Sequence, residues 1–213
     1  PVDDYYIGSF ELAGFREETA DIPVIAGTVL GEFNFMHYLG DKNRYSEKEK
    51  MALLRETFGD QTERILELFL EQYPGKDPLY ALSVDFLFRP ATVAFLDERT
   101  KFLKKLGKET RSWNYVLSVV LPYLGGITLF HCGDIPFTFR NTELEPLICT
   151  AADYREELED RMSEAWLAFM KNGDPSTKEL PWEPYTVEHK TRMQFDGQSR
   201  MNRTDDTELL VCF

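Results

Sequence analysis

One histidine and one glutamate follow the ends of apolar runs and carry groups that can move protons. His131 stands in the stretch LFHCGDIPF (residues 129–137), directly after the longest uncharged run in the chain. Imidazole titrates nearer neutrality than any other side chain, so it is suited to taking up and returning a proton. Glu32 follows the apolar run of residues 22–29. A simpler interpretation stays open for each: a histidine at the edge of the core, and a solvent-facing acid that opens a loop.

A histidine and a carboxylate in this arrangement could form two members of a hydrolase triad. The histidine would act as general base toward a serine hydroxyl, and the carboxylate would orient the imidazole. In α/β hydrolases the chain order is Ser, acid, His, and Glu32 precedes His131 as this order requires. The nucleophile is not in the pattern, because G-x-S-x-G occurs nowhere, and Ser199 in GQSRM is interpreted as a turn or strand serine. There is also no glycine-rich HGG-type stretch for an oxyanion hole.

Two buried parallel strands are expected to place these residues. Residues 22–29 and 113–120 are short, apolar and rich in β-branched side chains, which is typical of such strands. The segment between them is far longer than a parallel crossover needs. Glu32 and His131 both lie beyond the carboxyl end of a predicted strand, where open α/β sheets place their sites. A further short strand is predicted at residues 5–7.

The segment between the strands is predicted to be helical. Ser46-Glu47-Lys48-Glu49 has the pattern of a capping box and starts a helix that ends at Gly59. Further helical segments are predicted at residues 61–73, 78–88 and 90–106, and the apolar stripes of the first and the last are interpreted as core faces. Residues 46–106 would then form a helical insert that covers the strand ends and shapes the substrate pocket.

The last third of the chain predicts a long helix and a hairpin. Residues 151–171 form an amphipathic pattern, and the acidic side is interpreted as a solvated face. Residues 191–195 alternate like an edge strand, the tight turn Asp196-Gly197 follows, and residues 199–202 could return antiparallel. There is no repeat or linker, so residues 1–213 are expected to form part of one α/β domain.

Composition and charge limit the classes of partner. With 43% hydrophobic and 14% aromatic residues, a chain of 213 residues can bury a globular core. A net charge of −13 argues against nucleic acid and anionic membrane as partners, because both require a basic surface. No apolar run reaches the 18 residues of a membrane span. The three cysteines fit neither a disulfide framework nor a zinc site, so we expect no metal and a reducing, cytoplasmic location.

Several segments in the right order resemble the C-terminal part of the type B carboxylesterases, the family that includes the cholinesterases. IPVIAGT with Glu32 resembles the segment that carries the family's acid, and HCGDIPFTF (residues 131–139) resembles the segment that carries its histidine. WLAF with NGDP, and then PWEPY (residues 181–185), resemble its closing helix and tail. The resemblance runs from about Asp21 to the C-terminus.

The resemblance implies an α/β-hydrolase fold and carboxylic ester hydrolysis through a Ser-His-Glu triad without a cofactor. His131 would be the base, Glu32 the acid, and Asp134 a residue that supports them. The chain departs from the family pattern at Gly31 and Phe33, beside the acid, and at Cys132, where the family often has glycine. These departures leave the triad roles intact but affect the expected shape of the pocket.

The absent nucleophile leaves three hypotheses. The chain starts with Pro1, without an initiating Met and without a signal peptide, so we expect it to be the C-terminal portion of an esterase whose N-terminal portion supplies the serine and oxyanion hole. Such a portion would be inactive alone and would leave an unpaired strand edge. The alternatives are a non-catalytic binding module like the adhesion relatives of cholinesterases, and a stand-alone truncation with a structural role. The other histidines are interpreted as structural, His37 near the site wall and His189 in a charged loop.

Overall fold

The centre of the fold is a sheet in which β1 (Val24–Val29) and β2 (Ser112–Leu117) lie parallel and side by side. The structure, a computed structural model, describes residues 15–33, 39–150 and 153–213. β5 (Arg192–Phe195) pairs parallel with the other edge of β2, and β6 (Arg200–Asn202) pairs antiparallel with β5. The parallel strands and the C-terminal hairpin confirm the predicted α/β class.

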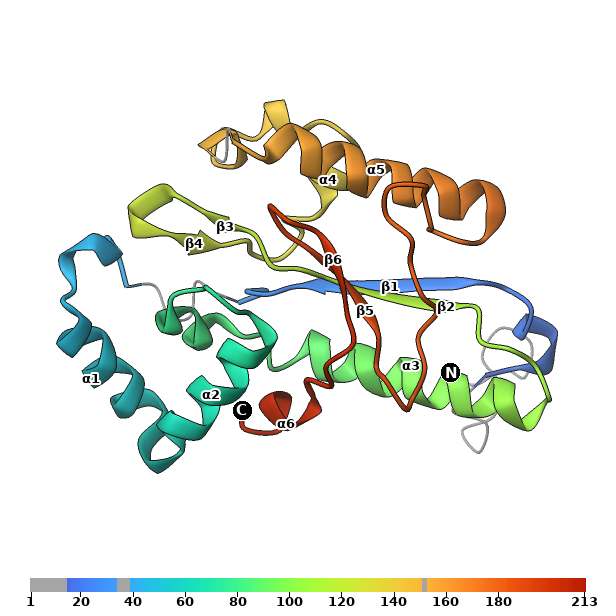
Figure 1. Cartoon of the computed structure of the whole chain (residues 1–213), viewed down its shortest axis with the longest axis horizontal. Coiled ribbons are helices and arrows are strands. Elements are labelled where there is room, and N and C mark those ends of the chain that lie inside the picture. The colour runs from blue at the N-terminus through green and yellow to red at the C-terminus, as the bar shows by residue number, and fades with distance from the viewer. Residues whose placement is uncertain (1–14, 34–38, 151–152) are drawn as a thin grey trace, which may run out of the picture.

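Helices cover both faces of this sheet. The helix α3 (Phe88–Lys105) runs along one face, and α5 (Arg155–Asn172) lies across the opposite face (Figure 1). The described part of the segment between β1 and β2 contains the predicted helices, except that the segment predicted at residues 78–88 forms a 3-10 helix only at Pro78–Ser83 and is not helical at 84–87. The helices α1 and α2 gather at the end of the molecule near the carboxyl ends of these strands (Figure 1). The remaining elements are α1 (Glu47–Phe58), α2 (Thr62–Gln72), α4 (Ile135–Thr138), α6 (Thr207–Leu210), and the small hairpin of β3 (Val120–Leu121) and β4 (Ile127–Thr128).

The local signals in the insert act as the sequence indicates. The Ser46 hydroxyl accepts a hydrogen bond from the Glu49 amide, and the Glu49 carboxylate accepts one from the Ser46 amide at 2.8 Å, which confirms the capping box. Gly59 ends α1 with a positive φ of 57°, a conformation that glycine adopts without steric cost. The insert does not act only as a cover, because α3 packs against β1.

The two faces of β2 point into two different cores. Successive side chains alternate across a strand, so Trp113, Tyr115 and Leu117 pack toward α5, while Val116 packs among the helices of the insert. All six residues of β2 are buried. A central strand buried on both faces fixes the start of the segment that follows it, which runs through the β3–β4 hairpin to His131.

The prediction of an edge strand at residues 191–195 was wrong. β5 lies between β2 and β6 and is buried along its whole length. Its alternating polar residues are paired in the interior: Arg192 donates to the Gln72 side chain at 2.5 Å, and Gln194 donates to Ser118 at 3.1 Å. Polar alternation therefore marks a buried hydrogen-bonded network here and not a face toward water.

The acidic side of α5 is only partly a solvated face. Glu156 and Glu157 are exposed as expected, but Glu159 is buried, accepts a hydrogen bond from Thr142 and lies 3.6 Å from the Arg155 guanidinium. The short strand predicted at residues 5–7 lies outside the described residues. None of the described helices is both long and apolar enough to cross a bilayer.

Candidate active site

The side chains of His131 and Glu32 meet beyond the carboxyl ends of β1 and β2. The Nδ1 atom of His131 lies 2.7 Å from Oε2 of Glu32. The His131 amide also donates to the Glu32 carbonyl at 3.1 Å, so backbone and side chain both join the two loops. The other carboxylate oxygen, Oε1, accepts the Val29 amide at 2.9 Å. With one oxygen held by the strand end, the carboxylate is aimed at the imidazole.

Glu32 is shielded from water while the histidine is open to it. Glu32 is 6% exposed, and the side chain of His131 is 56% exposed. Burial raises the pKa of Glu32 and the nearby charge of Asp85 adds to this, while hydrogen bonds from Val29 and His131 act in the opposite direction. A buried acceptor beside an exposed imidazole can hold the Nδ1 proton and leave Nε2 free to exchange a proton with a reactant.

The local backbone explains the residues beside the acid and the base. A Cβ atom at Gly31 would lie 2.2 Å from the Thr128 hydroxyl, so only glycine lets the Glu32 loop approach β4 this closely. Cys132 has a φ of 66°, in the left-handed region that favours glycine. A glycine at this position, as the resembling family often has, therefore matches the conformation that Cys132 adopts here.

Asp134 contacts the sheet through a tyrosine. Its carboxylate accepts a hydrogen bond from the Tyr115 hydroxyl at 2.7 Å. Burial, with the charges of Asp134 and Glu32, keeps the pKa of Tyr115 well above its ordinary value of 10, so the phenol remains a donor. The Tyr115 ring lies over Gly27, the residue opposite it in β1, where a Cβ atom would be 2.2 Å from the ring. The hydrogen bond between Tyr115 and Asp134 therefore joins the histidine loop to β2.

A small cavity of about 210 Å³ opens beside the two side chains. Residues of β1, of α3 and of the histidine loop line it: Gly27, Thr28, Glu32, Phe88, Thr92, His131, Cys132 and Asp134. No serine is among these described lining residues. Ser199 lies in the β5–β6 turn, where its hydroxyl donates to the Asp196 carbonyl at 3.1 Å, as a turn serine does. The described residues thus bring an imidazole and a carboxylate together, with no serine in the lining of this cavity.

The remaining histidines are placed apart or not described. His189 is exposed in the turn before β5, where its amide donates to the Thr186 hydroxyl at 3.2 Å. His37 lies outside the described residues.

Sequence reasoning named Phe33 only as a departure from the family pattern, and it missed the other residues around His131. Phe33 and Phe88 lie with their rings nearly parallel to the imidazole, and the Tyr115–Asp134 hydrogen bond and the close approach of Tyr115 to Gly27 support the loop. A glycine inside an apolar strand is a signal of close approach by another group, and Gly27 carried that signal. The two phenylalanines carried none that differs from an ordinary core stripe.

Known proteins show similarity over nearly the whole chain. The model of the carboxylesterase family matches residues 1–211. A solved esterase from Clostridium hathewayi, described as able to hydrolyse aliphatic aromatic polyesters, superposes with a TM-score of 0.88 at 32% identity, over 99% of this chain and 41% of that one. A thermophilic pNB esterase gives a TM-score of 0.58 at 22% identity, over 89% of this chain and 38% of that one, and supports the α/β-hydrolase fold.

Curated relatives give the same result. The para-nitrobenzyl esterase of Bacillus subtilis is 22% identical over 88% of this chain and 37% of its own length. The phenmedipham hydrolase of Pseudarthrobacter oxydans is 26% identical over 78% of this chain and 34% of its own length. The chain therefore spans only between about one third and two fifths of the length of these proteins. With a family model that matches almost every residue, the chain belongs to the carboxylesterase family.

Proposed function

We propose that this chain supplies the base, His131, and the acid, Glu32, of a Ser-His-Glu triad that hydrolyses carboxylic esters. The serine and the oxyanion hole would come from a preceding portion of a longer protein, called the parent enzyme below. The two portions would complete one α/β-hydrolase domain. The observation that carries the proposal is the 2.7 Å contact between Nδ1 of His131 and the buried carboxylate of Glu32.

The chemistry follows from this contact. With its Nδ1 proton held by Glu32, the imidazole accepts the serine proton at Nε2 as the serine oxygen attacks the ester carbonyl. The same proton passes to the alcohol oxygen when the ester bond breaks, which leaves an acyl-enzyme. Water repeats the sequence and releases the acid. Asp134 would support the base indirectly, because its hydrogen bond to Tyr115 fixes the loop on which His131 lies.

Two surfaces of the chain could pack against the further portion of polypeptide that we propose. The edge of β1 that faces away from β2 pairs with no strand among the described residues. Parallel strands are normally covered and paired on both sides, so an open edge invites a further strand. A groove of about 720 Å³ between α4 and α5 is lined by exposed apolar side chains, including Ile135, Phe139, Leu167 and Met170.

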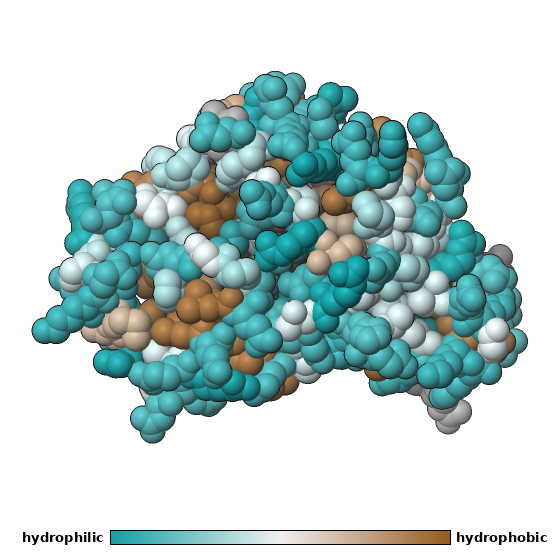
Figure 2. All heavy atoms as spheres, viewed as in Figure 1, coloured by the Kyte–Doolittle hydropathy of each residue, from teal (hydrophilic) through white to brown (hydrophobic). Residues whose placement is uncertain are grey.

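Further apolar surface lies over the insert and beside the β3–β4 hairpin. Figure 2 shows hydrophobic side chains gathered in two areas of one face, beside the β3–β4 hairpin and between α1 and α2. Exposed apolar surface of this kind is typical of an interface. The three cysteines are free thiols, which fits the cytoplasmic location that we include in the proposal.

An active-site-directed fluorophosphonate tests where the nucleophile lies. Peptide mapping of the labelled parent enzyme is expected to find the adduct on a serine outside these 213 residues, and the separate chain is expected to take no label. Para-nitrobenzyl esters are a suitable substrate for the turnover control, because a relative is named for them. A labelled serine within this chain would contradict the division of the triad, and undiminished turnover after His131→Ala would favour a binding role.

A further inference from the structure

Two phenylalanine rings lie nearly parallel to the imidazole of the proposed catalytic base. The Phe88 ring is 5.2 Å from the imidazole of His131, with 12° between the planes. Phe33 is 6.4 Å from the imidazole with 7° between the planes, and 5.4 Å from Phe88 with 18°. These centroid distances are those at which aromatic rings attract each other. The imidazole is therefore one member of a stacked group, in addition to being a partner of Glu32.

The imidazole needs this support because its other restraint is slight. The described contacts of its ring nitrogens comprise one interaction, between Nδ1 and Glu32. A ring that is more than half exposed and held at one atom can swing about that contact. Parallel rings against its face oppose that swing, because any tilt would separate the stacked surfaces or drive them into each other.

Phe88 is well anchored for such a role. It is the first residue of α3, and Asp85 accepts its amide at 3.1 Å and the amide of Leu87 at 3.0 Å. The Asp85 amide in turn donates to the carbonyl of Leu30, at the end of β1. On the other side of Phe88, the buried Arg89 guanidinium donates to Asn114 of β2 at 2.6 Å. The ring thus projects from a segment joined to both strands that carry the site.

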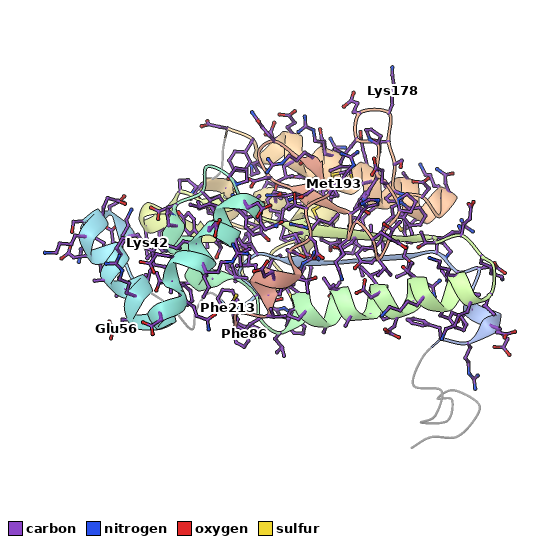
Figure 3. The ribbon with its side chains drawn as sticks, turned by 60° about the horizontal axis from the view of Figure 1, so that its bottom comes forward. Lys42, Glu56, Phe86, Lys178, Met193 and Phe213 are labelled. Carbon is purple, nitrogen blue, oxygen red and sulfur yellow. The ribbon has the colours of Figure 1, made fainter. Side chains whose placement is uncertain are left out.

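The second ring comes from the acid loop itself. Phe33 follows Glu32 directly in the chain, so the acid and one stacking ring are placed by the same short turn. Phe86 continues the aromatic cluster at 6.2 Å from Phe33, and Figure 3 shows it at the surface beside the start of α3. The acid loop, through Phe33, and the insert, through Phe88, therefore both restrain the imidazole, although these residues are more than fifty positions apart in the chain.

We propose that Phe88 is a positioning residue for His131, with Phe33 as its partner, and that the helical insert controls the orientation of the base through this ring. The inference rests on the proposed function of His131. The ring acts through the imidazole and does not itself touch the reacting atoms. Replacing it should lower kcat more than it changes KM, because the angle of the base matters in the chemical step, whereas the ring is one of eight residues that line the cavity.

The test compares Phe88→Leu and Phe88→Tyr in the parent enzyme, each alone and with His131→Ala. The matched control is Phe95→Leu, the same change on the same helix at similar exposure (41% against 38%), whose ring contacts Phe15 instead of the site. Phe88→Leu is expected to lower kcat about ten- to a hundredfold, the range that misplacement by about 1 Å can cause. Phe88→Tyr and Phe95→Leu should stay within about twofold of the wild type.

The background variant identifies the route of the effect. Once His131 is alanine there is no imidazole to position, so adding Phe88→Leu should change the residual rate little. A loss of the same size in that background, a change in KM alone, or no change in kcat would overturn the inference. Full turnover by His131→Ala alone would instead defeat the proposed function. Thermal unfolding of each variant shows whether a loss of kcat comes from misfolding. Phe33→Leu removes the other ring beside the imidazole and should therefore also lower kcat in a folded enzyme.

Discussion

Gly27 offers a sharp test of how the histidine loop is held to the sheet. In the substitution Gly27→Ala, the new Cβ atom would lie 2.2 Å from two carbons of the Tyr115 ring and 2.4 Å from a third. The ring cannot move aside freely, because it is buried and the edges of Trp166, Trp182 and Phe195 surround it. Either the strands separate or the tyrosine turns away from Asp134.

The cost follows from these two responses. Forcing an extra methyl group into a packed core costs about 1–3 kcal/mol. Loss of the 2.7 Å hydrogen bond from Tyr115 to the Asp134 carboxylate costs about 1.5–3 kcal/mol, the range for hydrogen bonds to charged groups. Because either response alone costs this much, we expect Gly27→Ala to lower the free energy of unfolding by about 1–3 kcal/mol. A loss of this size is a large part of the stability of a typical domain.

Urea unfolding of the parent enzyme, followed by tryptophan fluorescence, measures this loss. Tyr115→Leu provides the control, because it removes both the aromatic ring that a Cβ atom at position 27 would clash with and the hydroxyl that donates to Asp134. In that background Gly27→Ala should cost less than about 1 kcal/mol, so the two changes should be strongly coupled. A loss below about 0.5 kcal/mol in the wild type, or equal losses in both backgrounds, would refute the reasoning.

Three further predictions concern neighbouring residues. Cys132→Gly removes the strain of a left-handed backbone conformation at this position and should raise the free energy of unfolding by up to about 1 kcal/mol. Cys149→Gly, in a short helical turn, should instead lower the free energy of unfolding, and urea titration measures both changes. The raised pKa of Glu32 means that the native state binds its proton more tightly than the unfolded state. The wild type should therefore lose stability relative to Glu32→Gln as the pH rises from 4.5 through the native pKa, and the opposite slope would contradict this. Arg89→Met removes the guanidinium that lies 2.9 Å from the Asp206 carboxylate and leaves that carboxylate buried. The free energy of unfolding should fall by about 3–5 kcal/mol in the same titration, and a fall of less than about 1 kcal/mol would show that the pair contributes little.

Local signals in the sequence predicted much of the fold. The capping box at Ser46, the glycine after α1 and the β-branched run before Glu32 each depend on neighbours in the chain, and the structure confirms them. The position of β5 inside the sheet could not be derived in this way. It depends on the contacts of Arg192 with Gln72, which lies in the distant helix α2, and with Asp206, which follows the β5–β6 hairpin. Alternation alone does not show whether a polar side chain meets a polar partner or water.

The same limit applies to the candidate site. The order of Glu32 and His131 behind two apolar runs was enough to predict that they belong together, and the structure brings their side chains into contact. Whether they act in catalysis stays a prediction. Phe88 and Tyr115 were missed because their partners are chosen by three-dimensional proximity: Phe88 reaches His131 from the start of α3, and Tyr115 reaches Asp134 across the sheet.

The most direct measurement of the central claim is the turnover of a para-nitrobenzyl ester by the parent enzyme carrying His131→Ala, Glu32→Gln or both. A base and the acid that orients it act as one unit, so their losses should not add. We predict that His131→Ala lowers kcat/KM about 10²- to 10⁴-fold, that Glu32→Gln also lowers it, and that the double variant is no slower than His131→Ala. Near-wild-type turnover by a folded His131→Ala enzyme would contradict the assignment of His131 as the catalytic base.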